Sequence, residues 1–339
     1  MDPHRFQTIT SKYASLQIAV IGDFCLDRYF EIDPALQEIS IETNLPVHNV
    51  IHTRCSPGAA GTILNNLVAL GIGTLYPVGF SGQDAEGHEL RLALSSKPGV
   101  KLDHFLTTPL RRTFCYTKPL LMHPGQPPEE LSRLDFKNWS PTPPNVSQTL
   151  ANSVQIIANQ VDAVIVLDQV DIAETGVITP DVRKALADIA CSHPNKFMIA
   201  DSRRGLRDFP PLSYKMNAQE LTAMRKVPAD STIEELKKTT SELAAELHRP
   251  AFVTLSERGI LGAMPNQPAE HIPCHPILGP IDVVGAGDSV TANLTAASAA
   301  GASLLESLEL ANAAASIVIH QVGTTGTASV PQLKQQLLP

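Results

Sequence analysis

Residues 282–289, Asp-Val-Val-Gly-Ala-Gly-Asp-Ser, are the stretch of the chain best suited to chemistry on phosphate. Gly285 and Gly287 lack a Cβ, so the backbone N–H groups around Ala286 can converge into a nest for an anion. The apolar helical pattern that follows adds unpaired N–H groups and the positive end of a helix dipole. Asp288, on the first turn of that helix, stands where a general base takes the proton of an attacking hydroxyl. The alternative interpretation is a tight turn with Asp288 as a helix cap.

The elements that must position this turn are apolar runs that alternate with amphipathic helical patterns over most of the 339 residues. The runs predict strands at 17–21, 74–78, 163–167, 197–200 and 251–255. The periodicity predicts helices at 60–70, 86–95, 146–159, 181–191, 233–247, 289–300 and 304–322. This alternation predicts an α/β fold, with a doubly wound, mostly parallel sheet and helices on both faces.

Composition limits the classes of function. The net charge of −8 argues against a nucleic-acid surface, although it leaves room for an anionic small substrate held by a few local cations. The five cysteines are scattered without metal-ligand or redox spacing, so we expect them to be reduced. The apolar stretch 286–319 is interrupted by polar residues and predicts two buried helices, not a membrane span. The first six residues do not resemble a signal peptide, so we expect a cytoplasmic location.

Acidic residues follow four of the predicted strands. These residues are Asp23, Asp168, Asp201 and Glu257. Open parallel sheets bind ligands beyond the carboxyl ends of their strands, so four acids at that edge favour a polyol or magnesium-phosphate site. A single acid at such a place is usually a cap or loop residue, which remains the alternative for each of them.

Two segments, 28–53 and 111–136, leave this pattern because they carry short β-like runs and prolines but no helix that could enter the core. We expect them to form a small antiparallel sheet over the active crevice. Ordinary surface hairpins are the alternative.

Several motifs occur in a characteristic order along the chain. They are Gly22-Asp23 with Asp27, Pro57-Gly58-Ala59-Ala60 with Asn66, Asn217-Ala218-Gln219-Glu220, residues 254–259, residues 282–289, and Asn312 with Gly323-Thr324. In this order and spacing the set resembles the PfkB, or ribokinase-like, carbohydrate kinases, over about residues 18–331. Leu26-Asp27-Arg28-Tyr29, residues 39–47 and Arg133-Leu134-Asp135-Phe136 further resemble the heptose 7-phosphate kinase domain of lipopolysaccharide-core biosynthesis.

The resemblance implies ATP-dependent phosphorylation of a sugar or sugar-phosphate hydroxyl. Asp288 would be the general base, and Gly285, Ala286 and Gly287 the anion hole. The resemblance also implies one kinase domain over residues 1–339, in which 28–53 and 111–136 form a lid through which two copies pair. ATP and Mg²⁺ would be the cofactors, with K⁺ as a further candidate, and no nucleic acid or membrane partner is expected.

The resemblance assigns further residues by position. Those expected at the substrate are Asp23, Asp27, Arg28, Gly58, Ala59, Thr62, Asn66, Lys118, Arg133 and Asp168. Those expected at the nucleotide are Asn217, Thr254, Ser256, Glu257, Gly259, Asn312 and Ala315. Asn217 and Glu220 would order Mg²⁺ through water, and Asp282, Val284 and Gly323 would hold a monovalent cation. Helix capping is the alternative for the Asn217–Glu220 pair, and a turn cap is the alternative for Asp282.

The chain departs from the family at Ala59 and Thr62, where the family usually has glycine and asparagine. These changes put the usual sugar contact in question and leave two alternatives. One is another PfkB specificity, such as ribose, fructose or a nucleoside, and the other is a kinase fold that has become a ligand-binding regulator. A Rossmann oxidoreductase is not expected, because no G-x-G-x-x-G follows the first strand. Because the chain ends at Pro339, we expect no nucleotidyltransferase domain of the kind that some heptose kinases carry.

Overall fold

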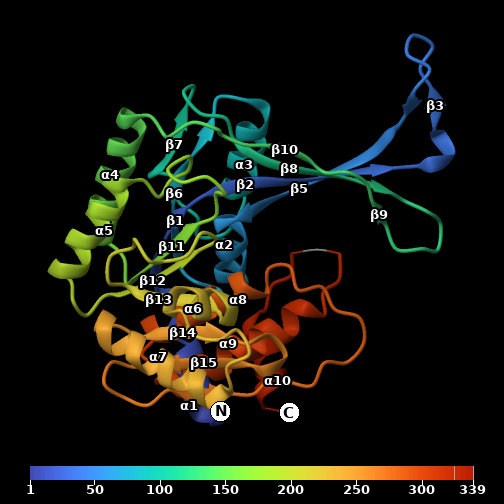
Figure 1. Ribbon diagram of the computed structural model, residues 1–339. Coiled ribbons are helices and arrows are strands. Elements are labelled where there is room, and N and C mark those ends of the chain that lie inside the picture. Colours follow the sequence, from blue (N-terminus) through green and yellow to red (C-terminus); the bar gives the residue numbers. More distant parts are fainter. Residues whose placement is uncertain (324, 339) are drawn as a thin grey trace.

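The computed structural model, which describes residues 1–323 and 325–338, contains a core sheet between layers of helices and a smaller outer sheet (Figure 1). The core sheet has the strand order β16-β15-β14-β13-β12-β11-β1-β6-β7. Its strands are β1 (Gln17–Gly22), β6 (Thr74–Gly82), β7 (Phe105–Thr108), β11 (Ala163–Asp168), β12 (Phe197–Ser202), β13 (Ser213–Asn217), β14 (Ala251–Thr254), β15 (Ile260–Ala263) and β16 (Glu270–Ile272). Neighbouring strands from β14 to β7 are parallel, and the β14–β15 and β15–β16 pairs are antiparallel. The predicted α/β class with a mostly parallel sheet is confirmed.

Helices cover both faces of this sheet. They are α1 (Pro3–Thr10), α2 (Ala60–Ala69), α3 (Ala85–Ser95), α4 (Pro144–Ala158), α5 (Pro180–Ser192), α6 (Ala218–Arg225), α7 (Ile233–Leu247), α8 (Ala286–Ala299), α9 (Leu304–Ile319) and α10 (Val330–Leu337). Helices α2, α8 and α9 pack on one face, and α4, α5 and α7 pack on the other. The predicted helices all have counterparts here, with ends that differ by a few residues at most.

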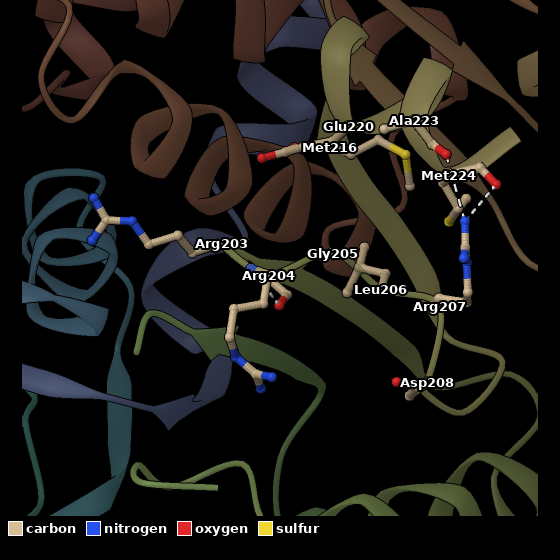
Figure 2. Close-up of a pocket in the computed structure, with 11 residues that line it drawn as sticks. Arg203, Arg204, Gly205, Leu206, Arg207, Asp208, Met216, Glu220, Ala223 and Met224 are labelled. Carbon is tan, nitrogen blue, oxygen red and sulfur yellow. Dashed lines mark hydrogen bonds between the residues drawn. The ribbon is translucent and has the colours of Figure 1, made fainter. Parts of the chain in front are cut away.

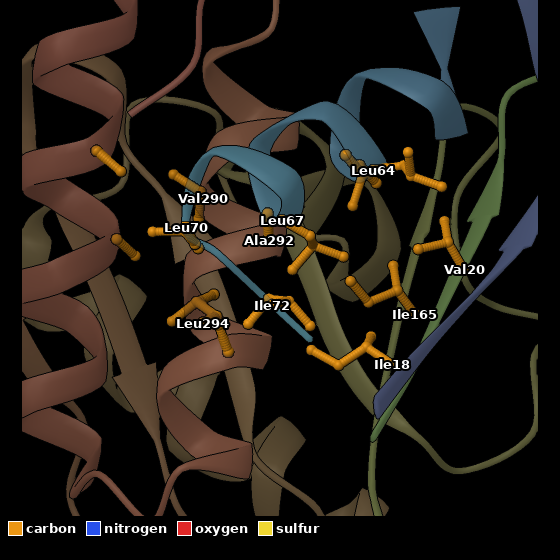
Figure 3. Close-up of a cluster of buried hydrophobic side chains, with 14 of the residues drawn as sticks. Ile18, Val20, Leu64, Leu67, Leu70, Ile72, Ile165, Val290, Ala292 and Leu294 are labelled. Atoms are coloured by element: carbon orange, nitrogen blue, oxygen red, sulfur yellow. The ribbon is translucent and has the colours of Figure 1, made fainter. Parts of the chain in front are cut away.

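Strand β1 shows why a central strand appears in the sequence as a continuous apolar run. Ile18 and Val20 point into the core cluster under α2 and α8, whereas Ala19 and Ile21 point into the cluster under α4 and α5. Figure 3 shows the first cluster, in which β1 side chains meet those of α2 and α8. Fully burying an isoleucine or valine side chain stabilises a fold by about 1.5–3 kcal/mol, so a strand buried on both faces anchors the sheet strongly.

The outer sheet has the order β10-β8-β2-β5, with β9 paired to β8. Its strands are β2 (Phe24–Ile32), β5 (Val50–Ala59), β8 (Phe114–Leu121), β9 (Glu129–Glu130) and β10 (Leu134–Phe136). The two segments that broke the sequence pattern therefore supply this sheet together. The expectation that it would be antiparallel is wrong in one respect, since β2 and β8 run parallel. The sheet is mixed because its β2–β5 and β8–β10 pairs are antiparallel.

A long extension of the outer sheet reaches away from the body of the protein (Figure 1). It ends in the short pair β3 (Glu38–Ile39) and β4 (Pro46–Val47). Apolar side chains along this extension lie open to solvent, among them Ile39, Ile41, Leu45 and Ile51. Within the described part of the chain, none of the helices has the length and apolar character needed to cross a bilayer.

Candidate active site

The turn that opens α8 contains two glycines, and its backbone favours glycine at Gly285. Gly285 has φ +82°, and a Cβ there would come within 2.8 Å of Thr325 Cγ2. A Cβ on Gly287 would lie 3.0 Å from the Nζ atom of Lys215. Helix α8 begins at Ala286 without a capping side chain at its N-cap position, which Gly285 occupies. The first N–H groups of α8 thus lie beside a lysine, as a site for an anion requires.

Asp288 lies on the first turn of α8 among several charges. Burial raises the pKa of its carboxyl; Lys215 opposes this shift and the charges of Asp201 and Asp27 assist it, so that the pKa is about 7. A carboxylate with a pKa near 7 can accept a proton at neutral pH and is still basic enough to do so effectively. Asp288 is therefore suited to general-base chemistry.

Lys215 was not predicted from the sequence, yet it is central to the site. Its Nζ lies 2.7 Å from Asp201 Oδ2, and both side chains are largely buried. The pair lies at the carboxyl ends of the neighbouring strands β12 and β13. A single charged residue in the short apolar stretch before Asn217 was the signal available in the sequence.

Two of the acids that follow strands have a structural role. Asp23 is 3% exposed and accepts hydrogen bonds from the N–H groups of Gln169 and Val177. Asp168 is 1% exposed and accepts from Ser202 Oγ and from Arg204 at 2.7 Å. Both carboxylates therefore hold the loops after β11 and β12, and the structure argues against the prediction that they contact substrate.

Strand parity decides which outer-sheet residues face the crevice. Asp27 pairs with Tyr116 across β2 and β8, and Tyr29 pairs with Lys118, so these side chains share one face. Asp27 lies over Gly58, where a Cβ would collide with its carboxylate. Burial raises the pKa of Asp27, and Lys118 and Arg133 oppose that shift, which places both cations near it. The face toward Asp288 thus carries Asp27, Lys118 and Arg133 together.

Arg28 lies on the opposite face and corrects one prediction. Adjacent strand residues point to opposite sides, so Arg28 cannot share the crevice with Asp27. Its guanidinium instead pairs with Glu86 at 3.3 Å and Glu89 at 3.0 Å, both on α3. We therefore exclude Arg28 from the substrate site.

The start of α2 explains part of the departure from the family motif. Ala59 is the N-cap of α2 with φ 53° and ψ −117°, a conformation that glycine adopts without strain. Thr62 is 2% exposed, and its methyl lies 3.5 Å from where a Cβ on Gly285 would be, so it supports the turn from below. Asn66 is fully buried and donates to the Thr62 carbonyl. Direct substrate contact is thus ruled out for Asn66 in this geometry, and Thr62 acts on the turn.

Asn217 and Glu220 form a capping box at the start of α6. Asn217 Oδ1 accepts from the Glu220 N–H at 2.9 Å, and Glu220 Oε2 accepts from the Asn217 N–H at 2.7 Å. Burial raises the pKa of Glu220, and the charge of Asp201 also raises it. The capping alternative is therefore present in the structure, and the carboxylate also lies near the Lys215–Asp201 pair.

A cavity of about 380 Å³ brings the predicted nucleotide residues together. It is lined by Lys215, Asn217, Thr254, Ser256, Glu257, Gly259, Ala286, Gly287, Asn312, Ala315 and Ile319, among others. Asn312 donates to the Pro273 carbonyl at 2.8 Å, which fixes its amide at the wall. One end of the cavity is apolar and the other reaches the anion turn, a shape that accommodates a base and its phosphates.

A second cavity, of about 450 Å³, lies beside Glu220 (Figure 2). Its wall includes Arg203, Arg204 and Arg207 from the loop after β12. Arg207 donates to the carbonyls of Ala223 and Met224. The side chains of Arg203 and Arg204 extend away from Arg207 (Figure 2). These arginines were not predicted as site residues.

The loop before the anion turn holds the residues predicted for a monovalent cation. Asp282 Oδ1 accepts from the Val284 N–H at 3.0 Å, and the Asp282 N–H donates to the Ile319 carbonyl. The turn-cap alternative for Asp282 is thus present. Gly323 adopts φ +78°, and the neighbouring Thr324 lies outside the described residues. No group of three or more His, Cys, Asp or Glu side chains suited to a metal occurs among residues 1–323 and 325–338.

Known proteins similar to this chain indicate the family that it resembles. Residues 206–331 match the pattern described as pfkB family carbohydrate kinase. The predicted PfkB resemblance is confirmed. The bifunctional protein HldE of Gluconacetobacter diazotrophicus is 27% identical over 325 residues, which cover 96% of this chain and 64% of that protein. HldE of Caulobacter vibrioides is 31% identical over 320 residues, covering 92% and 62%. The chain thus spans less than two thirds of the length of these relatives.

The solved structures similar to this chain include a ribokinase and a phosphofructokinase. The structure of Arabidopsis thaliana ribokinase complexed with ribose and ATP superimposes with a TM-score of 0.68, at 20% identity over 96% of this chain and 99% of that chain. Escherichia coli phosphofructokinase-2 in complex with fructose-6-phosphate gives 0.67, at 17% identity over 94% and 97%. At such identities the likeness establishes the ribokinase-like fold.

Proposed function

We propose that this PfkB-like protein transfers the γ-phosphoryl group of ATP to a hydroxyl of a sugar or sugar phosphate. The position of Asp288 carries the proposal. This carboxylate adjoins the cavity lined by Gly287, and it is close enough to Asp27 for the charge of Asp27 to raise its pKa. A base between a nucleotide cavity and a polyol-binding acid is the arrangement that transfer to a hydroxyl requires.

Each step of the transfer has a residue of this chain. Asp288 takes the proton of the acceptor hydroxyl, and the oxygen forms a bond to the γ-phosphorus as the bond to the β,γ-bridging oxygen breaks. ADP leaves with that oxygen. The backbone N–H groups around Ala286 stabilise the charge on the transferring oxygens, and Lys215 adds a positive charge beside Gly287. Asp27 orients the sugar by accepting hydrogen bonds from its hydroxyls.

Glu220 and Asn217 would hold Mg²⁺ through water. The donor set fits, because Mg²⁺ prefers oxygen ligands, keeps several waters and needs only one or two carboxylates nearby. Asp201, whose charge acts on Glu220, adds a second carboxylate to this region. When bound, Mg²⁺ neutralises charge on the phosphates. For a monovalent cation, Asp282 and the backbone of Val284 and Gly323 are the candidate ligands.

The acceptor that suits the site best is a sugar that already carries a phosphate, as in the heptose 7-phosphate kinases that the motifs resemble. Lys118 and Arg133 both act on Asp27 from the same face of the outer sheet. Charge-assisted hydrogen bonds to phosphate are worth roughly 1.5–3 kcal/mol each, so two such cations would favour a phosphorylated acceptor strongly.

The outer sheet would act as a lid that excludes water and as the contact between two copies. Supporting observations are the charge of Asp27, on β2, which acts on the Asp288 carboxyl, and the exposed apolar side chains of the extension, Ile39 and Ile41 among them. Apolar side chains on an open-edged sheet favour pairing with a second copy. A cytoplasmic location would give this enzyme access to ATP.

A ligand-binding regulator is the second candidate, and Ala59 and Thr62 favour it because they alter the usual sugar contact. ADP formation distinguishes the two functions. We expect release of ADP from ATP and Mg²⁺ to depend on one member of a panel of heptose 7-phosphate, fructose 6-phosphate, fructose and ribose. Binding of a panel member without sugar-dependent ADP release would favour the regulator.

A further inference from the structure

Five charged side chains form a continuous bridge between the outer sheet and the loops of the core sheet. We call this set the charge bridge, and it comprises Arg133, Asp135, Lys137, Asp171 and Arg203. Arg133 donates two hydrogen bonds to Asp135, at 2.6 and 2.8 Å. Lys137 lies 3.4 Å from Asp135 and 2.9 Å from Asp171. Arg203 reaches Asp171 at 3.5 Å from the other side.

Asp171 is the one member of the bridge on which cations from different segments converge. Lys137 comes from the end of β10, Arg203 from the loop after β12, and Asp171 itself from the loop after β11. Lys137 above all, then Arg203 and Arg133, lowers the pKa of the Asp171 carboxyl below its ordinary value. Asp171 is 48% exposed, so its carboxylate lies where a dissolved anion can reach the same cations.

The charge bridge adjoins the place assigned to the sugar. Arg133 lies 4.9 Å and Lys137 5.9 Å from the ring of Tyr116, which is the register partner of Asp27. Arg133 also acts on the Asp27 carboxyl. An anionic group on a sugar held by Asp27 would therefore approach the cations that Asp171 now occupies.

We propose that Asp171 is a specificity-determining residue, a built-in competitor for the phosphate of the acceptor. This inference rests on the proposed function. In the structure Asp171 pairs with Lys137 and Arg203, and a phosphorylated sugar binds beside Arg133 by taking over those two cations. A phosphate monoester offers nearly two charges and three oxygens against one carboxylate, so it displaces Asp171. A neutral sugar has no charge with which to replace Asp171 at the two cations. A smaller anion must also compete with the Asp171 carboxylate, so Asp171 adds selectivity by weakening the binding of other ligands.

Equilibrium binding to the full chain tests the competitor without turnover. Fructose 6-phosphate and fructose serve as probes in isothermal titration of the wild type, Asp171→Asn and Lys137→Met. Asp188→Asn, an exposed acid on α5, is the control for the same change in net charge. Asp171→Asn should bind fructose 6-phosphate about tenfold more tightly, the change expected when two part-exposed ion pairs no longer compete. Lys137→Met should bind it more weakly, and fructose affinity should not change in any variant.

Unchanged or weaker binding of fructose 6-phosphate by Asp171→Asn would overturn the inference, because the carboxylate would then be neutral or helpful to the ligand. An equal gain in the Asp188→Asn control would overturn it too, since net charge alone would explain the effect. No binding of the phosphorylated probe by any variant would also overturn it. Sugar-dependent ADP release is measured separately, so the proposed kinase function can stand or fail independently of this result.

Discussion

Replacing Lys215 with methionine should destabilise the protein strongly, because it leaves Asp201 without its partner. The ion pair is short, at 2.7 Å, and the side chains of Lys215 and Asp201 are only 8% and 14% exposed. Removing one member of a buried pair typically costs about 3–5 kcal/mol, since the other charge stays buried and unpaired. Contact of Asp201 with water reduces this loss, whereas repulsion from Asp288 increases it. We therefore expect a loss of about 3 kcal/mol in the free energy of unfolding.

Urea denaturation at constant pH measures this loss, and two variants control it. Lys237→Met removes an exposed pair with Glu234, at 3.4 Å, and should cost under about 0.5 kcal/mol. The double variant Lys215→Met/Asp201→Asn removes both charges and should recover about 2 kcal/mol of the loss. A Lys215→Met protein within about 1 kcal/mol of the wild type, or a double variant no more stable than the single one, would refute the reasoning.

Four further predictions follow from the site. Ala59→Gly should stabilise the protein by about 1 kcal/mol in urea denaturation, because it relieves a strained positive φ; a loss of stability would contradict this. The transfer rate should rise with pH and reach half its plateau near pH 7, where Asp288 ionises, and a flat profile between about pH 6 and about pH 8 would exclude that group as the base. K⁺ should raise activity relative to tetramethylammonium, and Asp282→Ala should flatten the response; equal rates in both salts would remove the cation site. Light scattering at tens of micromolar (~10–50 μM) should give twice the mass of one chain, whereas a monomer would count against pairing through the outer sheet.

The stability of Asp288 variants gives a related check with a definite sign. The pKa of Asp288 in the folded state, about 7, exceeds its ordinary value of 3.8. The folded state therefore binds more protons than the unfolded state between these values, so stability falls as pH rises from about 4 to about 7. Asp288→Asn should remove this fall and stabilise the protein at pH 8, by about 1–2 kcal/mol once partial exposure of the carboxylate is allowed for. A destabilised variant at pH 8 would mean that the carboxylate is held by contacts that favour its charge.

Much of the core sheet could be predicted from the sequence, because strands buried on both faces appear as unbroken apolar runs. Strand β13 was not predicted, because a charged residue interrupts its apolar run. Its residues include Lys215, a charge that is stable there only because Asp201 lies beside it, and the distance between the two residues in sequence hides the pairing. The glycine turn at the start of α8, with Asp288 on the first turn of the helix, could be predicted because the backbone at a helix start depends on local sequence.

The substrate side was predicted less well, for physical reasons that differ between residues. Arg28 follows Asp27 directly, so strand parity alone excludes one of them from the crevice, and that signal was available. Asp23 and Asp168 end buried strands as active-site acids do, yet backbone N–H groups and Arg204 consume their carboxylates. These partners lie 36 to 154 residues away in the sequence, so the residues next to each acid do not reveal them.

The most direct test of the account is phosphoryl transfer by Asp288→Asn, measured together with its affinity for ATP. Loss of a general base typically lowers the rate by about 10²–10⁴, so we expect kcat to fall in that range. Nucleotide affinity should stay close to the wild type, because the cavity residues and the anion turn are unchanged. A variant that keeps most of the wild-type kcat would contradict the assignment and leave Asp288 as a structural residue at the start of α8.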